Sequence, residues 1–396
     1  MTAEVLDLRT VRRWRNAIIV AFALGGIVMS TWGPRLPSLR ADLGVDNSFL
    51  GLILGGVTIG SIGGLLASSA MLGRLGARLA IRATLWLASI GIAGIGFGAG
   101  VAHSVVITAL GFVAVGFGIG AVDVMINVEG SAVERAAGRT LMPLMHAAWS
   151  AGVIIGSAIG AAAAALSVPF AWQFVGEALM VAAATAVATG FIPVAAPDEG
   201  PKAPVRQRIR DWLRGWTDLR LLMIGLVMLG VELGEGSANN WLTLGVLDGH
   251  GRSDAVAAAF FTVFAIGETA ARVGGGPLVD RIGRVTTIRA TTALGVVGLL
   301  AFILGGPVPL VLAGVLLWAV GVSMGFPLGM SAAADSGPNP AARVSVVASI
   351  GYIANLGGPP VVGALSEHVG LLNALFVIIA LLVVGFCCAG ALRPRN

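Results

Sequence analysis

The segment Gly276-Pro-Leu-Val-Asp-Arg-Ile-Gly-Arg284 decides the fold of this chain, because it is a short charged connection between two long apolar runs. A shorter copy, Arg74-Leu-Gly76, lies at the corresponding place in the first half of the chain. Gly116-Phe-Gly-Ile-Gly120 and Gly321-Val-Ser-Met-Gly325 form a second matching pair. Motifs repeated in the same order indicate two structurally similar halves, related by an axis along the membrane normal if the runs cross a bilayer.

The apolar runs are long enough to cross a membrane. Hydrophobic residues make up 57% of the 396 residues and charged residues only 11%, with a mean hydropathy of +0.92. A soluble domain carries about 25% charged residues, and about 20 apolar residues cross a hydrocarbon core of about 30 Å. We therefore expect an all-α membrane protein with twelve transmembrane helices. They are predicted near residues 16–37, 47–72, 79–100, 105–133, 141–165, 170–194, 219–247, 254–279, 285–304, 307–334, 341–365 and 370–392.

One long hydrophilic segment divides the chain. It predicts an N-terminal six-helix half at 1–194, a cytoplasmic central loop at 195–218 and a C-terminal six-helix half at 219–396. Placing both termini in the cytoplasm puts the basic residues on that side, with four exceptions, and this is the positive-inside pattern. The exceptions among the 25 Lys and Arg residues are Arg35, Arg40, Arg252 and Arg272. We expect a multi-pass protein of the cell inner membrane.

Several chemistries lack their sequence signatures. The arginines fall in loops rather than on one face, so the net charge of +5 indicates topology and not nucleic-acid binding. Gly321-Val-Ser-Met-Gly325 has the spacing of a hydrolase motif but lies within an apolar run, where that motif's strand and turn are missing. We expect no enzyme activity, no metal and no cofactor. The expected partners are a small-molecule substrate, protons and the lipid bilayer, and the expected state is a monomer.

The segment from Gly276 to Arg284 resembles the signature loop between helices 8 and 9 of the major facilitator superfamily. Within it, the resemblance assigns a gating role to Gly276, Asp280, Arg281, Gly283 and Arg284. The first copy departs from the motif, with Ser69 in place of the glycine and Gly73 in place of the aspartate. The resemblance implies two six-helix halves around a central cavity lined by helices 1, 4, 7 and 10.

Ionisable groups inside the bilayer are candidates for function, because each costs about 2.5 to 3.5 kcal/mol to insert. In helix 4, Asp123 and Asn127 share one face, whereas Glu129 points about 120° away. This spacing is similar to that of the L-fucose proton symporter group, in which the acid is a protonation site. The second acid of that group, in helix 1, has no counterpart here. Asp123 is thus a proton or substrate site, or else makes a structural hydrogen bond.

Helix 7 carries a second polar stripe formed by Glu232, Glu235 and Asn239, with Asn240 at its edge. Gly234 and Gly236 lower the helix propensity around Glu235 and favour a bend there. Trp32 and Trp241 lie at matching places in the two halves, where they either stack on a sugar-like ring or anchor the helices at the membrane interface.

Glu268 and Arg272 lie one helical turn apart, the spacing at which side chains meet. They form either a self-neutralising pair or a switch in which Arg272 reaches Glu232 or Glu235 on helix 7. His146 in helix 5 either relays protons or hydrogen-bonds to a neighbouring helix.

Tyr352 and Asn355 share a face of helix 11 and can hydrogen-bond a solute. Glu177 shares a face with Gln173 in helix 6, and the sequence suggests no role for it.

These features predict a secondary active transporter that moves a small polar solute, sugar-like or polyol-like, by alternating access and proton-coupled symport. The alternatives are a drug or metabolite/proton antiporter and a non-transporting membrane receptor or scaffold. The predicted proton-coupling residues are Asp123, Glu235 and Glu268. The predicted substrate-binding residues are Asn127, Asn239, Asn240, Trp32, Trp241, Tyr352 and Asn355.

Overall fold

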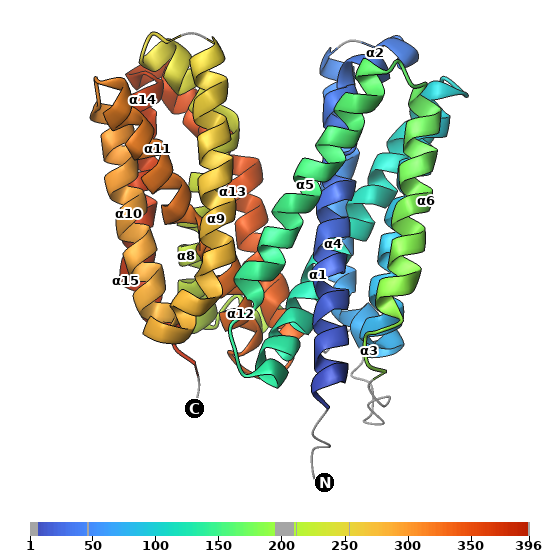
Figure 1. Cartoon of the computed structure of the whole chain (residues 1–396), viewed down its shortest axis with the longest axis horizontal. Helices are drawn as coiled ribbons and strands as arrows, with labels where there is room; N and C mark the ends of the chain where they lie inside the picture. Colours follow the sequence, from blue (N-terminus) through green and yellow to red (C-terminus); the bar gives the residue numbers. More distant parts are fainter. Residues whose placement is uncertain (1–6, 46, 195–209, 211, 253, 395–396) are drawn as a thin grey trace. The chain divides into compact units, whose positions relative to one another are not determined.

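A computed structural model describes residues 7–45, 47–194, 210, 212–252 and 254–394 (Figure 1). Most of the predicted central loop lies outside these residues, as does the side chain of Asn355. The chain divides into two compact units. Unit 1 comprises residues 1–138 and 148–204, and unit 2 comprises residues 139–147 and 205–396. The short segment 139–147 therefore packs with unit 2, although it precedes the predicted central loop.

Unit 1 is built from six helices. They are α1 (Leu8–Ser30), α2 (Leu36–Leu43), α3 (Asn47–Gly100), α4 (Val105–Ala137), α5 (Met142–Ala165, whose first turns group with unit 2) and α6 (Phe170–Thr189). α3 and α4 pack closely, and their backbones touch at glycines four residues apart. A Cβ at Gly60 would lie 2.1 Å from the carbonyl oxygen of Val113, and one at Gly116 would lie 2.1 Å from that of Val57. Small residues let membrane helices approach this closely.

Unit 2 contains the remaining elements. They are α8 (Leu219–Leu244), a π-helix η2 (Gly245–Gly249), α9 (Asp254–Ile282), α10 (Arg284–Leu304), α11 (Val308–Ser323), α12 (Gly325–Ala334), α13 (Pro340–Val369), α14 (Leu371–Ala374), α15 (Phe376–Cys388) and a 3-10 helix η3 (Ala389–Leu392). α8 runs unbroken through Gly234 and Gly236, so their low helix propensity does not interrupt the helix. The bend at these glycines stays a prediction.

The twelve predicted spans correspond to these helices. Each half of α3 forms one span, the pairs α11 with α12 and α14 with α15 form one each, and the other long helices form the rest. Among the described residues, eight helices are long and apolar enough to cross a membrane by length and composition. The charged helices α1 and α9 are not among these eight, and α13 qualifies only as a shorter apolar stretch.

The repeated Arg-x-Gly motif has the same backbone conformation in both units. Gly76 interrupts α3 with φ 70° and ψ 163°, and Gly283 precedes α10 with φ 80° and ψ 159°. Only glycine adopts this region of φ and ψ readily. The motif is therefore a tight turn that ends one span and starts the next, and the internal repeat read from the sequence is present in the backbone.

Candidate functional site

In unit 1, α4 brings Asp123 and Asn127 into direct contact. The Asn127 side-chain amide donates to Asp123 Oδ1 at 3.1 Å and to the Asp123 carbonyl oxygen at 2.8 Å. The Asp123 side chain is 6% exposed and that of Asn127 is fully buried. The two residues act as one polar group, as their spacing predicts.

Glu129 is separate from this pair. Its Oε2 accepts a hydrogen bond from the Trp14 indole nitrogen of α1 at 3.1 Å. Trp32, just after α1, lies edge-on to Phe112 of α4 with ring centroids 5.5 Å apart, and is half-buried. A cavity of about 690 Å³ lies in unit 1 between α1 and α6, with Arg13 and Asn16 in a mainly apolar wall. None of the predicted site residues lines it.

In unit 2, Arg272 of α9 is held between two carboxylates. Arg272 Nη2 lies 2.6 Å from Glu235 Oε2 of α8 and 2.7 Å from Glu268 Oε1, one turn earlier on α9. The contact with Glu235 has hydrogen-bond geometry, whereas that with Glu268 is an ion pair without it. Glu232 also interacts electrostatically with Arg272. Arg272 therefore contacts both its neighbour Glu268 and Glu235 of α8, and the switch between them stays a prediction.

The break between α11 and α12 supplies a further partner for Arg272. Arg272 Nε donates to the carbonyl oxygen of Ser323, the last residue of α11, at 3.3 Å. In a continuous helix that carbonyl would accept from residue 327, which is proline and has no N–H. The interrupted helix thus exposes a backbone acceptor to a buried cation. This acceptor was not predicted, although Pro327 within an apolar run signals it.

His146 also belongs to unit 2 and lies near the same group. Its ring packs edge-on against Phe326 of α12, with centroids 5.1 Å apart, and it is 7% exposed. Its electrostatic interaction with Arg272 adds a fifth titratable residue beside the four charged residues Glu232, Glu235, Glu268 and Arg272. We call these four residues the Arg272 cluster.

The predicted substrate-binding residues of unit 2 differ in how far they are buried. Asn239 and Asn240 are exposed, and the Asn240 amide donates to the Gly236 carbonyl oxygen of its own helix at 2.6 Å. Trp241 is half-buried against Gly363 of α13, and its indole nitrogen has no hydrogen-bond partner among the described residues. Tyr352 is half-buried on α13. These groups are accessible to a solute to different degrees.

The predicted gating loop joins three segments of unit 2. Asp280 Oδ1 accepts from the backbone N–H of Thr140 at 2.8 Å, and a Cβ at Gly276 would lie 2.7 Å from the Thr140 carbonyl oxygen. Arg284 pairs with Asp335 at 2.9 Å and with the Ser331 hydroxyl at 2.7 Å. Arg281 is exposed. The charged motif therefore ties the α9–α10 turn to segment 139–147 and to α12.

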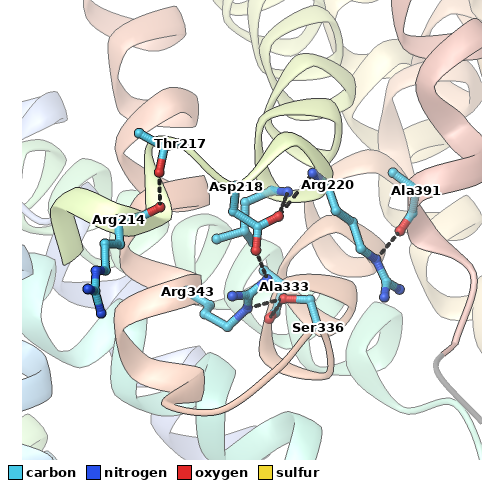
Figure 2. A network of polar contacts seen from close by, with 9 residues as sticks. Arg214, Thr217, Asp218, Arg220, Ala333, Ser336, Arg343 and Ala391 are labelled. Carbon is cyan, nitrogen blue, oxygen red and sulfur yellow. Dashed lines mark hydrogen bonds and ion pairs between the residues drawn. The ribbon is translucent and has the colours of Figure 1, made fainter. Parts of the chain in front are cut away.

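A second network, centred on Asp218, lies at the start of α8 (Figure 2). Asp218 caps α8 by accepting from the backbone N–H groups of Arg220 and Leu221, and it pairs with Arg343 Nη2 at 2.7 Å. Arg343 also donates to Ser336. Partial burial raises the pKa of Asp218, but the hydrogen bond from Arg343, its charge and the capping N–H groups outweigh burial and leave the pKa below its usual value.

The network continues to the end of the chain. Arg220 Nε donates to the carbonyl oxygen of Ala391 in η3 at 3.0 Å, and its Nη2 donates to that of Arg393. The sequence analysis treated Asp218 only as the end of the central loop. An aspartate directly before an apolar helix is the signal that could have identified the cap.

Helical spans that hold buried charges on and beside an interrupted helix define a multi-pass membrane transporter. The family model of the Major Facilitator Superfamily matches residues 18–345 and 224–396. The chain belongs to this family, which confirms the resemblance and the fold class. A curated relative, the uncharacterized transporter y4wD of Sinorhizobium fredii, is 28% identical over 375 residues, covering 93% of this chain and 95% of its own.

Solved structures share the fold. The transporter FucP in the outward conformation superposes with a TM-score of 0.81 at 15% identity, over 96% of this chain and 99% of its own. The proton:xylose symporter XylE superposes with a TM-score of 0.68 at 17% identity, over 96% of this chain and 95% of its own. At these identities the likeness concerns the fold alone.

Proposed function

We propose that the protein is a proton-coupled symporter of a small polar solute, sugar-like or polyol-like, working by alternating access in the cell inner membrane with both termini in the cytoplasm. The coarser statement, that it is a multi-pass transporter of the Major Facilitator Superfamily, follows from its family. Proton coupling and the class of solute are the parts that the proposal adds.

The Arg272 cluster is the observation that carries the proposal. One guanidinium lies within 2.7 Å of carboxylate oxygens of both Glu235 and Glu268. If both acids are ionised, the three groups carry one excess negative charge, and Glu232 adds another. Buried excess charge is costly, and one bound proton neutralises the three groups. The cluster thus has a chemical reason to take up and release a proton.

The break between α11 and α12 supports a link between this proton and conformation. Arg272 bonds both to Glu235 on α8 and to the free Ser323 carbonyl at the end of α11. When Glu235 is protonated, it no longer attracts the guanidinium, so Arg272 is held more by Glu268 and Ser323. A proton therefore changes how α8 is bound to α9 and α11.

The Asp123 and Asn127 pair is the corresponding group of unit 1. A carboxylate and an amide in contact present both an acceptor and a donor, which suits the hydroxyl groups of a sugar or polyol. The exposed amide of Asn239 and the aromatic ring of Trp32 are further groups suited to such a solute. The names of the solved neighbours, among them a proton:xylose symporter, agree with this class.

The test uses purified protein in liposomes. Sugars, polyols and amino compounds are screened for uptake with and without an imposed pH gradient. We expect gradient-driven uptake of at least one polar solute, with proton uptake alongside it, and loss of the gradient dependence in Glu235→Gln. Glu367→Gln is a matched control, the same acid-to-amide change at an exposed residue of α13 outside the Arg272 cluster, and it should keep proton coupling. Solute uptake that is indifferent to pH gradient in the wild type would refute proton coupling.

A further inference from the structure

Glu177 is a buried acid that the proposed coupling groups do not use. It lies on α6, seven residues after the first residue Phe170, or about 10 Å into the helix at 1.5 Å per residue. Its side chain is 4% exposed. An acid at this depth of a membrane helix is costly unless it has a task or a partner.

The hydrogen-bonding groups around Glu177 are short of donors. Gln173, one turn earlier and 6% exposed, donates its amide to Glu177 Oε2 at 3.4 Å. Within the described part of the chain, Glu177 Oε1 and Gln173 Oε1 are both buried without a hydrogen-bond partner. Thr31, fully buried beyond the end of α1, interacts with the same carboxyl, but its hydroxyl donates to the Ile27 carbonyl oxygen at 2.8 Å.

The charged groups that face α6 lie at its two ends. Near the start, Arg35 donates to the Val168 carbonyl oxygen and lies over the Phe170 ring. Beyond the other end, Arg78 donates to the Ile192 carbonyl oxygen. The remaining groups also lie at that end: Arg82 of α3, which donates to Thr189, and Arg13 of α1, which lines the cavity beside Ala184 and Phe191. None of these arginines is among the groups that interact with Glu177.

We propose that Glu177 is a second proton-binding site of unit 1, in addition to Asp123. A proton from water adds to the carboxylate at its unpartnered Oε1, removes its charge and creates one O–H donor in a cluster in which Gln173 Oε1 is an unfilled acceptor. Because Thr31 belongs to the α1 segment and Glu177 to α6, the proton is bound where these two segments pack. The inference rests on the proposed proton coupling and adds a site to it.

Infrared spectroscopy of the full-length protein in lipid nanodiscs tests the site without knowledge of the solute. The carbonyl band of protonated carboxyl groups is followed from about pH 5 to about pH 9, a range that brackets the titration of buried glutamates. We expect a pH-dependent component that Glu177→Gln lacks and that Glu129→Gln, a change at another acid of unit 1, retains. Gln173→Leu removes the amide that donates to the carboxylate, so the component should persist to higher pH.

A spectrum that Glu177→Gln leaves unchanged over this range would overturn the inference, because Glu177 would then keep one protonation state and serve only as a hydrogen-bonding group. Failure of the proposed function has a different signature. If the wild type shows no gradient-driven uptake but the Glu177 component titrates, coupling fails and the proton site stands. If uptake is gradient-driven and the component is missing, the site fails and coupling stands.

Discussion

Replacing Arg272 by leucine is the most informative single change, because the structure predicts both its cost and how that cost can be removed. Arg272 is 6% exposed and lies 2.6 Å from Glu235 and 2.7 Å from Glu268. Arg272→Leu leaves two carboxylates without their cation. Removing one partner of a buried ion pair costs about 3 to 5 kcal/mol.

The two contacts account for a loss of this size. A hydrogen bond to a charged group contributes about 1.5 to 3 kcal/mol, and Arg272 makes one to Glu235 and a close ion pair with Glu268. The Glu235 side chain is 22% exposed, so water screens part of its contribution. We therefore expect a loss of about 3 kcal/mol, toward the lower end of the range for buried pairs.

The assay is chemical unfolding of the purified protein in detergent micelles, at about pH 8 and about pH 5, where an uncompensated buried glutamate changes its protonation. The loss of stability in Arg272→Leu should be largest at the higher pH. At the lower pH, protonation neutralises the carboxylates that have lost their cation. The triple variant Glu235→Gln, Glu268→Gln, Arg272→Leu should recover most of the stability. Equal losses at both pH values, with no recovery in the triple variant, would show that Arg272 acts through packing and refute the reasoning.

Three further predictions concern other parts of the chain. Gly283→Ala should cost about 1 to 3 kcal/mol of unfolding free energy because of its positive φ. Gly73→Ala, in open space within α3, should instead raise the unfolding free energy by up to about 1 kcal/mol, because alanine favours a helix more than glycine does. Equal effects in thermal unfolding would contradict this. Pro327→Ala should restore the N–H that competes with Arg272 for the Ser323 carbonyl, and so slow proton-coupled uptake without loss of folded protein. Pro307→Ala, at a helix start, is the control. Unchanged uptake in Pro327→Ala would argue against the role of the break. Asp218→Asn should lower the unfolding free energy by about 1 kcal/mol for this part-exposed pair. Because the folded-state pKa of Asp218 lies below its usual value, that difference should be constant at neutral pH and disappear only as pH falls through the folded-state pKa; a difference that vanishes already near neutral pH would count against the network.

Helical spacing was sufficient to predict the local pairs of the site. Asp123 with Asn127 and Glu268 with Arg272 are four residues apart, and each pair is in contact in the structure. Such contacts depend only on the helix itself, because residues four apart lie on the same face. The same reasoning separated Glu129, which bonds to Trp14 instead.

Contacts between helices could not be derived in this way. The sequence left open whether Arg272 reaches Glu235, because that depends on how α8 packs against α9. It also gave no reason to bring Thr31 to Glu177, or Asp218 to Arg343. Local propensity did not locate the interruption either, since α8 is unbroken at Gly234 and Gly236 while the break lies between α11 and α12, near Pro327.

The sequence by itself determined the class of protein. Long apolar runs, repeated turns and the scarcity of charge leave helical membrane spans as the solution, because every backbone polar group in the bilayer must be satisfied within its own segment. The tertiary structure decided which buried charges meet. Which of several acids a side chain such as Arg272 contacts depends on distance and direction. Distance and direction are set only when the helices pack.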